Sequence, residues 1–335
     1  ITSDAVFRSP LFKFILRFLG AIPKTKAQSD IDALKNIIAI KDRGDIIGIF
    51  PEGRRTWDGV TLPLVYSTSK LIRMLKVPVI TVLFKGGFFS QPRWGFNIQK
   101  GEIVMDYKRL FSGEEVASMK VADIHRKLAD CLYHDEIEYQ KLRRLEYKGE
   151  KTAEYIEQFL FACPSCSTIG KIRSRGRKFF CDQCGEGWEI NTFQEITGIK
   201  SDAVYNKTRD WNRWQLKLLE SVIDEAENNG KALLKDEGLL FHTGFKSRRL
   251  KLLAKGSMAL SAEKIEMFDS GGDLIKSVPL SGLSGLNIQN REILDFYCEG
   301  KLYTVRGIKK RFSAYKWLKA LEHIQQERMK RFEAE

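Results

Sequence analysis

Two pairs of cysteines form a specific metal-binding pattern in this 335-residue sequence. They are Cys163 with Cys166 and Cys181 with Cys184, and two residues separate the members of each pair. Such spacing places two thiolates on one tight turn, and four thiolates fill the tetrahedral shell of Zn²⁺ with no position left for catalysis. We therefore predict a structural Zn²⁺ site, in preference to a redox pair or unpaired thiols.

The second candidate site is a charged turn, residues 50–59, that follows a short apolar run. It offers one carboxylate, Glu52, two guanidinium groups, Arg54 and Arg55, and the flexible Gly53. An apolar run before a charged turn predicts a strand, and open α/β sheets bind ligands at the carboxyl ends of their strands. Because arginine contacts phosphate in a planar, bidentate manner, the charged turn is expected to bind a polar, anionic substrate. The structural alternative is a turn in which Glu52 forms an ion pair with either arginine.

Residues 50–56 also resemble the Phe-Pro-Glu-Gly-x-Arg-Ser/Thr block of the glycerolipid acyltransferases related to 1-acylglycerol-3-phosphate acyltransferase, with Thr56 in the Ser place. Two further blocks agree in order. Residues 19–26 resemble the second block of that family, with Lys26 where an Arg is usual, and residues 77–82 resemble its fourth block. The resemblance covers roughly residues 1–150.

This resemblance implies O-acyl transfer from an acyl thioester, carried by coenzyme A or acyl carrier protein, to the hydroxyl of a lysophosphatidate-like glycerolipid in phospholipid biosynthesis. It implies that Glu52, Gly53, Arg55 and Thr56, together with Lys26, bind the glycerol phosphate of this lysophospholipid acceptor. The family's general base would take the proton of the acceptor hydroxyl, and the alkoxide would attack the thioester directly.

That general base belongs to a His-x4-Asp block, which precedes the second block in the family. All the histidines of this sequence follow the charged turn, at His125, His134, His242 and His323. The sequence also starts at Ile1 without a Met. We therefore expect the His-x4-Asp block upstream of Ile1, no catalytic histidine within residues 1–335, and negligible turnover by these residues alone. His125 and His134 are interpreted as solvated helix histidines.

Alternating helices and apolar strands predict an α/β domain over residues 1–155, with a mainly parallel sheet covered by helices. Its strands are expected at residues 46–50, 79–84 and 100–107, and a long helix at residues 116–148. The α/β domain would place the charged turn at the carboxyl edge of the sheet.

Two smaller domains are expected after it. Residues 156–195, with the four cysteines, resemble a zinc ribbon whose hairpin tip carries the basic run at 171–178. Residues 196–335 predict a helix, then short antiparallel strands separated by turns, then a final helix capped by Ser313. By this order of elements, the last segment resembles a small α+β pleckstrin-homology-like (PH-like) or GRAM-like domain. His242 and the basic run at 246–251 could meet lipid headgroups there, or simply form a solvated face.

Two apolar segments leave alternatives open. Residues 10–19 predict a helix that is apolar nearly all round except for Lys13 and Arg17, so it belongs either to a core or to a membrane interface. The aromatic residues of the loop at 85–95 could line a groove for an acyl chain or pack over the sheet.

Fifty-six Lys and Arg residues against 43 Asp and Glu residues give a net charge of +13, which favours an anionic partner. No apolar run approaches the roughly 18 to 20 residues that a membrane-spanning helix needs. Free thiols suit a reducing compartment, so we expect a cytoplasmic protein bound peripherally to a membrane surface.

The alternative function is a non-catalytic adaptor that binds membranes or nucleic acid and carries a zinc ribbon. A basic strip is the electrostatic footprint of nucleic-acid binding. The ribbon and the C-terminal segment lack the interleaved aromatic residues that single-strand binding uses, so nucleic acid is not the expected partner.

Overall fold

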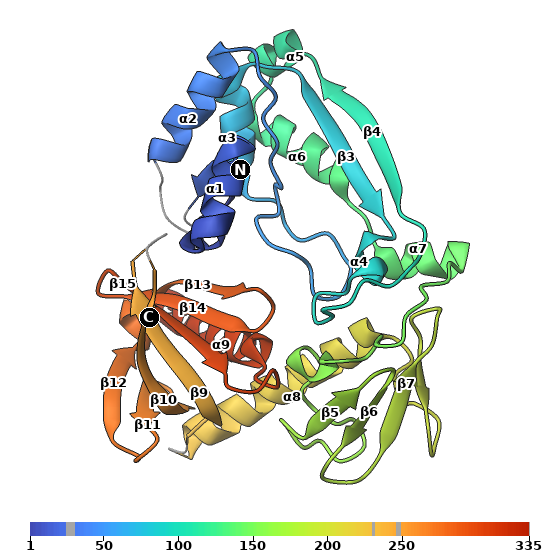
Figure 1. Cartoon of the computed structure of the whole chain (residues 1–335), viewed down its shortest axis with the longest axis vertical. Helices are drawn as coiled ribbons and strands as arrows, with labels where there is room; N and C mark the ends of the chain where they lie inside the picture. Colours follow the sequence, from blue (N-terminus) through green and yellow to red (C-terminus); the bar gives the residue numbers. More distant parts are fainter. Residues whose placement is uncertain (25–30, 230–231, 246–248, 335) are drawn as a thin grey trace.

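The structure, a computed structural model, describes residues 1–24, 31–229, 232–245 and 249–334. Its elements fall into an N-terminal, a middle and a C-terminal region (Figure 1). The N-terminal region contains β1 (Thr2–Ser3), a 3-10 helix (Asp4–Arg8), α1 (Pro10–Phe18), β2 (Pro23–Lys24), α2 (Ile31–Asp42), α3 (Tyr66–Leu75), β3 (Val79–Lys85), α4 (Gly87–Ser90), β4 (Val104–Phe111), α5 (Gly113–Ser118), α6 (Val121–Leu132) and α7 (Glu136–Arg143).

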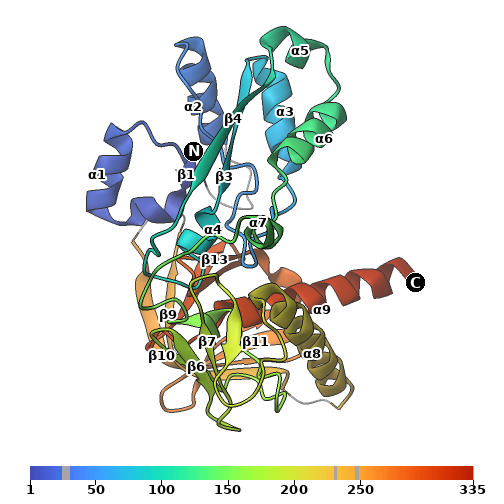
Figure 2. The ribbon, with the colours of Figure 1, turned by 90° about the vertical axis from the view of Figure 1, so that its right-hand side faces the viewer.

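Helices lie on both sides of the β3–β4 pair. Figure 2 shows α1 and α2 on one side of these strands and α3, α5 and α6 on the other. Near the ends of the strands, Phe111, Val116 and Ile124 form a small buried cluster. A second cluster joins α2 to the end of α3 through Ile37 and Leu75. None of the helices in the described part of the chain is both long enough and apolar enough to cross a membrane.

The prediction of a mainly parallel sheet is wrong. β3 and β4 pair in antiparallel fashion, and β1 and β2, of two residues each, are the parallel pair found among the described residues. Residues 46–50 form no strand; Ile46 and Phe50 are 97% and 79% exposed. A segment that is apolar on both faces becomes a central strand only when neighbouring strands and covering helices enclose it. Here Ile47 packs against the cluster of Ile37 and Leu75, but the segment pairs with no strand among the described residues, so its composition alone misled the assignment.

The long helix expected at residues 116–148 is three shorter helices, α5 to α7. Only α7 restarts at a side-chain N-cap, whereas α6 begins at Val121 without a side-chain cap bond. Ser112 forms a capping box with Glu115 before α5, and the carboxylate of Asp135 accepts hydrogen bonds from the first turn of α7. The strand expected at residues 100–107 begins later, at Val104. Side chains that bond the backbone locally favour such breaks over a continuous helix.

The middle region holds the four cysteines on a small antiparallel sheet. Its elements are a 3-10 helix (Ile156–Gln158), β5 (Ile172–Arg175), β6 (Lys178–Cys181), β7 (Gly187–Ile190) and β8 (Ile196–Gly198), with strand order β5-β6-β7-β8. The β5–β6 hairpin carries the basic run, as the sequence predicted. Within this run, Arg173 pairs with Asp182 and Arg177 with Glu189. The last strand, β8, lies beyond residue 195.

The C-terminal region contains a seven-stranded antiparallel sheet. In the sequence, one long helix precedes its strands and another follows them. Its elements are α8 (Thr208–Asn228), β9 (Leu234–Gly244), β10 (Lys251–Leu260), β11 (Lys264–Asp269), β12 (Leu274–Pro279), a 3-10 helix (Leu280–Gly282), β13 (Ser284–Gln289), β14 (Ile293–Cys298), β15 (Lys301–Gly307) and α9 (Ala314–Ala334). The strand order is β12-β11-β10-β9-β15-β14-β13. The predicted antiparallel strands and final helix are confirmed, and the Ser313 hydroxyl accepts a hydrogen bond from the Lys316 N–H (3.1 Å).

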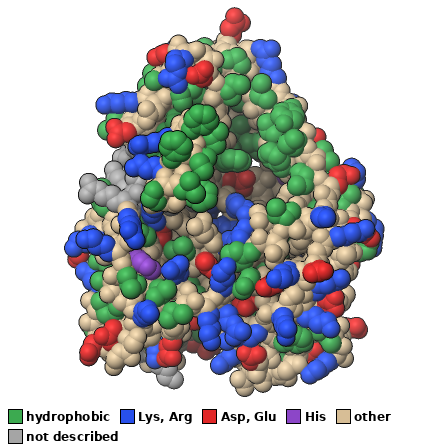
Figure 3. Space-filling model, in the orientation of Figure 1, with side chains coloured by type: hydrophobic (Ala, Val, Ile, Leu, Met, Phe, Trp, Pro, Cys, Tyr) green, Lys and Arg blue, Asp and Glu red, His purple; other side chains and the backbone are tan. Residues whose placement is uncertain are grey.

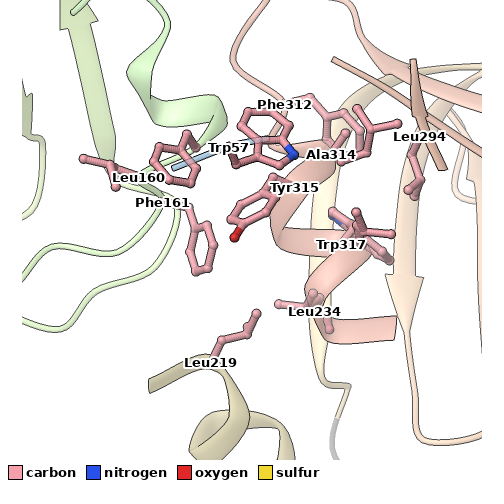
Figure 4. Close-up of a cluster of buried hydrophobic side chains, with 14 of the residues drawn as sticks. Trp57, Leu160, Phe161, Leu219, Leu234, Leu294, Phe312, Ala314, Tyr315 and Trp317 are labelled. Carbon is pink, nitrogen blue, oxygen red and sulfur yellow. The ribbon is translucent and has the colours of Figure 1, made fainter. Parts of the chain in front are cut away.

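One hydrophobic core joins the three regions. It contains Trp57 and Trp94 from the N-terminal region, Trp188 from the middle sheet and Trp317 from α9. Figure 4 shows the side chain of Trp57 beside Tyr315, with Phe161 on the other side of the Tyr315 ring. The charged turn is therefore anchored in a core that the C-terminal helix helps to build.

Candidate functional site

The backbone of the charged turn is held by two hydrogen bonds. The Gly53 N–H donates to the Phe50 carbonyl (3.0 Å), and the Val65 N–H donates to the Pro51 carbonyl (2.8 Å). Gly53 has a φ of +67°, in the left-handed region that only glycine enters without strain. A Cβ atom at this position would also lie 3.4 Å from Cγ2 of Val65. Gly53 therefore sets the path of the backbone that presents the two arginines.

Glu52 is turned away from these arginines. Its Oε2 accepts a hydrogen bond from the Leu62 N–H (2.7 Å), and burial raises the pKa of this carboxyl while that hydrogen bond lowers it. Arg54 instead pairs with Glu322 of α9 (3.5 Å). Among the residues that the structure describes, Glu52 forms no ion pair with Arg54 or Arg55, so the structural alternative of a salt-bridged turn is wrong.

Thr56 shapes the second half of the turn. Its Oγ1 donates to Oδ1 of Asp58 (3.0 Å) and accepts from the Gly59 N–H (3.2 Å). Such side-chain bonds to a nearby backbone stabilise a turn. Lys26, the other residue expected to bind the acceptor, lies outside the described residues.

Among the residues that the structure describes, Arg55 of the turn and the neighbouring Arg93 pair with no carboxylate. Nη2 of Arg55 donates to the carbonyl of Gln91. Arg93 is only 6% exposed; its Nη1 donates to the carbonyl of Arg55, and its guanidinium lies 4.4 Å from the ring centroid of Trp57. In the described ranges of the chain, neither Arg55 nor Arg93 forms an ion pair. Sequence reasoning missed Arg93. Nothing in the residues around it in the predicted loop distinguishes it from an ordinary surface arginine.

The electrostatics of these two groups are unusual. Burial, followed by the positive charges of Arg55 and Arg54, lowers the pKa of Arg93 to about 9. Burial and the charge of Arg291, on the turn between β13 and β14, lower the pKa of Arg55. Both groups remain protonated at neutral pH, so the protein holds several cations close together. We call Arg54, Arg55, Arg93 and Arg291 the arginine cluster.

The surface has a hollow beside the chain segment that connects α2 to α3. Figure 3 shows basic side chains at the lower edge of this hollow and hydrophobic side chains on both of its flanks, over α1 and over the β3–β4 pair. On that pair, strand alternation and register place Ile80, Phe84, Met105 and Tyr107 on one face, and all are exposed. The hollow thus combines a cationic end with apolar walls.

The apolar helix α1 is not a core helix. None of its side chains is buried, and Phe14 and Phe18 are 74% and 85% exposed. Among the described elements its main contact is the adjoining 3-10 helix, and most of its apolar side chains are exposed. Of the two alternatives left by the sequence, the core helix is wrong and the interface helix stays a prediction.

The aromatic residues of the loop at 85–95 do not line a groove. Phe88, Phe89 and Trp94 are buried, and Trp94 stacks on Phe159 with ring centroids 5.3 Å apart. Part of the loop is the short helix α4, whose start is fixed by the buried carboxylate of Glu136, which accepts from the Gly86 and Phe88 N–H groups. These aromatic residues are packed, as the alternative to a groove expected, but their printed ring contacts are with one another, Tyr147 and Phe159 rather than with the sheet.

Two of the histidines differ from their predicted setting. Nδ1 of His125 lies 3.0 Å from the hydroxyl of the buried Ser69. His134 follows α6 rather than lying on a helix, and its Nε2 is 3.4 Å from the carboxylate of Glu136. Neither is a solvated helix histidine. Among the described hydrogen bonds, ion pairs and ring contacts, none joins a histidine side chain to the charged turn.

His242 and His323 belong to the C-terminal region. Burial and the charge of Arg306 lower the pKa of His242, which disfavours the protonated form that a lipid headgroup would attract. His323 on α9 lies 2.9 Å from Asp224 on α8 and links the two helices. Of the basic run at 246–251, residues 246–248 lie outside the described residues.

The four cysteine sulfurs lie together at one end of the middle sheet. All four Sγ atoms are within 4.8 Å of one another. The distance is 3.7 Å between Cys163 and Cys184 and 3.7 Å between Cys166 and Cys181. A tetrahedral Zn²⁺ with bonds of about 2.3 Å places its sulfurs about 3.8 Å apart. The cysteines therefore fit a metal ion such as zinc, with all four positions filled by protein.

The two cysteine turns share the same backbone geometry. The Ser167 N–H donates to the Cys163 carbonyl (2.8 Å), and the Gly185 N–H donates to the Cys181 carbonyl (2.9 Å). In each pair, the residue after the second cysteine has a positive φ, +56° for Ser167 and +70° for Gly185. The repeated turn aims both thiols of each pair at one point, which is what a metal centre requires.

Comparison with known proteins bears on the N-terminal region. Residues 1–85 match the family model described as Acyltransferase. A search of curated proteins found no match. The matched range includes α1 and the charged turn, and it ends at Lys85, the last residue of β3. The N-terminus of the chain thus carries an acyltransferase domain, which supports a general acyltransferase function.

Proposed function

We propose that this protein transfers an acyl group from an acyl thioester to the hydroxyl of a phosphate-bearing glycerolipid such as lysophosphatidate. The observation that supports this most is the charged turn, whose arginine Arg55 has no carboxylate partner among the described residues and lies in the region that matches the acyltransferase family. An amphiphile with a phosphate at one end fits a hollow with a cationic end and apolar walls.

The residues of the charged turn have separate roles in this proposal. Arg55 binds the acceptor phosphate, and Lys26 is a second candidate for it. Glu52, Gly53 and Thr56 act through the backbone, because their observed hydrogen bonds and φ hold the turn in shape. They are positioning residues, and Arg55 is the binding residue.

Acyl transfer needs a base that takes the proton of the acceptor hydroxyl. The oxygen then attacks the thioester carbonyl, the C–S bond breaks, and the thiol of coenzyme A or acyl carrier protein leaves with a proton. By the family resemblance, this base would be the histidine of a His-x4-Asp block, which we propose lies ahead of Ile1. Residues 1–335 alone are then expected to bind the acceptor without turning it over.

The setting proposed for this reaction is the cytoplasmic face of a membrane. The exposed aromatics of α1, with Lys13 and Arg17 between them, have the composition of a helix that lies in a headgroup layer. Flotation with anionic vesicles tests this part. Phe18→Asp should weaken vesicle binding, whereas Leu142→Asp, an exposed leucine on α7, should not.

A structural Zn²⁺ is proposed for Cys163, Cys166, Cys181 and Cys184, as the core of a zinc ribbon. The four thiolates would complete its shell, so the ion would contribute folding free energy and no catalytic step. The PH-like or GRAM-like character of the C-terminal region is likewise a proposal, which rests on its antiparallel strands followed by α9.

The deciding experiment compares Arg55→Ala with Arg126→Ala, an exposed arginine on α6, in the chain extended by the sequence that its gene encodes ahead of Ile1. Losing a charge-assisted hydrogen bond of roughly 1.5–3 kcal/mol should raise the acceptor KM about 10-fold to 100-fold. The thioester KM should change little. Equal changes in both constants would remove the phosphate-binding role of Arg55. Vesicle binding without acyl transfer in any form would favour the membrane adaptor instead.

A further inference from the structure

The turn between β13 and β14 approaches the charged turn through one short segment, residues 91–96. The carbonyl of Gln91 accepts from Arg55. Arg93 donates to the carbonyl of Arg55 and, through Nη2, to the carbonyl of Ile288 on β13 (3.5 Å). At the far end of the segment, the guanidinium of Arg291 lies 4.6 Å from the ring centroid of Phe96. A single segment thus connects Arg55 with an arginine that is more than two hundred positions away in the sequence.

The backbone of this hairpin turn favours glycine, yet it carries an arginine. Asn290 has a φ of +44° and Arg291 a φ of +74°. Asparagine enters the left-handed region with little strain, whereas a long side chain such as arginine is disfavoured there. A residue held in such a conformation often marks a functional position. Here the strained residue places a cation at the edge of the arginine cluster.

The cluster carries more positive charge than its surroundings offset. Arg54 has Glu322 as its partner, and Glu292 lies next to Arg291 and favours its charged form. Among the described residues, no carboxylate pairs with Arg55 or Arg93. Lys310 adds a further cation, 4.1 Å from the centroid of the same Phe96 ring. Like charges at close range destabilise one another unless an anion joins them.

We propose that the β13–β14 turn completes the anion site of the charged turn, so that Arg55 and Arg291 hold one phosphate monoester from two sides. The C-terminal sheet then takes part in selecting the headgroup of the acceptor. This inference deepens the proposed function, on which its link to acyl transfer rests. A phosphate monoester suits two planar guanidinium groups, because it offers three terminal oxygens and close to two negative charges at neutral pH.

The test measures binding by the 335-residue chain, so it needs no turnover. Glycerol 3-phosphate is titrated by calorimetry, and phosphatidylcholine vesicles that contain phosphatidate or the diester lipid phosphatidylglycerol are compared by flotation. Arg291→Gly removes the charge and also relieves the positive φ, so its melting temperature should not fall. Asn290→Gly is the matched control, because it relieves φ in the same turn without removing a charge.

We expect Arg291→Gly to weaken binding of glycerol 3-phosphate by about tenfold or more, and Asn290→Gly to bind like the wild type. Arg291→Lys should fall between them, because it keeps the charge without the planar fork. If the variant also loses the preference for phosphatidate over phosphatidylglycerol, the ligand is a lipid headgroup. If only the soluble probe is affected, the ligand is a free phosphate ester. Should the glycine variant lose stability, Arg291→Gln carries the same test.

Three results would overturn the inference: wild-type affinity in Arg291→Gly, equal weakening in Asn290→Gly, or no binding of either probe by the wild type. The first of these leaves the Arg55 experiment, and with it the proposed function, untouched. Conversely, binding that depends on Arg291 together with a failure of acyl transfer in every form would retain this anion site and reject the acyltransferase proposal.

Discussion

At the scale of single residues, the charged turn divides its work between side chains that shape it and side chains that can bind a ligand. Glu52 and Thr56 bond to the backbone of the turn itself. Arg55 and Arg93 have no carboxylate partner in the described part of the chain. Since Arg93 donates to the Arg55 carbonyl, a buried cation lies next to Arg55, the residue proposed to bind the acceptor. This arrangement makes the turn electropositive at a position that solvent can reach.

A single methyl group at Gly53 should disturb this arrangement. Gly53→Ala forces a residue with a Cβ into the left-handed region, which costs about 1–2 kcal/mol of unfolding free energy. The arginines that follow would move with the backbone, so affinity for glycerol 3-phosphate should fall as well. Gly48→Ala is the control, because Gly48 has open space around it and no positive φ. Equal denaturation midpoints for the two variants would contradict this role of Gly53.

At the scale of elements, the cysteine turns show how local geometry fixes a site before any ligand binds. Each pair closes with the same hydrogen bond and the same positive φ. The sheet behind them packs Trp188 against Trp211 of α8, with ring centroids 4.9 Å apart. The four-cysteine cluster is thereby connected to the helix that leads into the C-terminal region.

Metal removal should therefore destabilise more than the small sheet of β5 to β8. We expect one zinc per chain by metal analysis and a lower melting temperature after chelation. Because metal binding stabilises only the folded state, losing a few kcal/mol of binding free energy should lower the midpoint of thermal unfolding by roughly 5–10 °C. Cys184→Ser should reproduce the effect with little change in packing, because Cys184 is exposed. Cys131→Ser, outside the cluster, should bind zinc normally. An unchanged midpoint after complete chelation would argue against a structural metal.

At the scale of the whole molecule, the three regions share one core. Trp57 stacks on Phe159 (5.6 Å between centroids) and lies against Tyr315 of α9 (4.8 Å). The ion pair between Arg54 and Glu322 likewise joins the N-terminal region to α9 of the C-terminal region. The charged turn is consequently placed by packing against α9, and it is not an independent surface loop.

Trp57→Ala should uncouple these regions. Removing a buried tryptophan costs about 3–5 kcal/mol, and here the cavity lies at the junction. Thermal unfolding is measured by calorimetry. We expect the variant to unfold in two separate transitions and the wild type to unfold more cooperatively. Phe50→Ala, in the same turn but with an exposed ring, should leave the unfolding curve nearly unchanged. A single transition in Trp57→Ala would show that other contacts suffice to join the regions.

The sequence by itself determined the local features. The spacing of Cys163, Cys166, Cys181 and Cys184 predicted their cluster, because two residues between thiols fix a turn whatever surrounds it. The short C-terminal strands with their turn signals and the cap at Ser313 were predicted for the same reason, since turn chemistry and capping act over a few residues. The composition of the charged turn offered Arg54 and Arg55 alike as anion-binding candidates, and the family resemblance singled out Arg55.

Only the tertiary structure decided which segments meet. The apolar run at residues 46–50 has the composition of a central strand, yet pairing depends on neighbours that composition does not reveal. Arg93 and Arg291 look like ordinary surface arginines in the sequence. They become part of a site because the core around Trp57 and Tyr315 brings the β13–β14 turn against residues 91–96. Long-range packing sets the charge around a residue, and no local pattern records it.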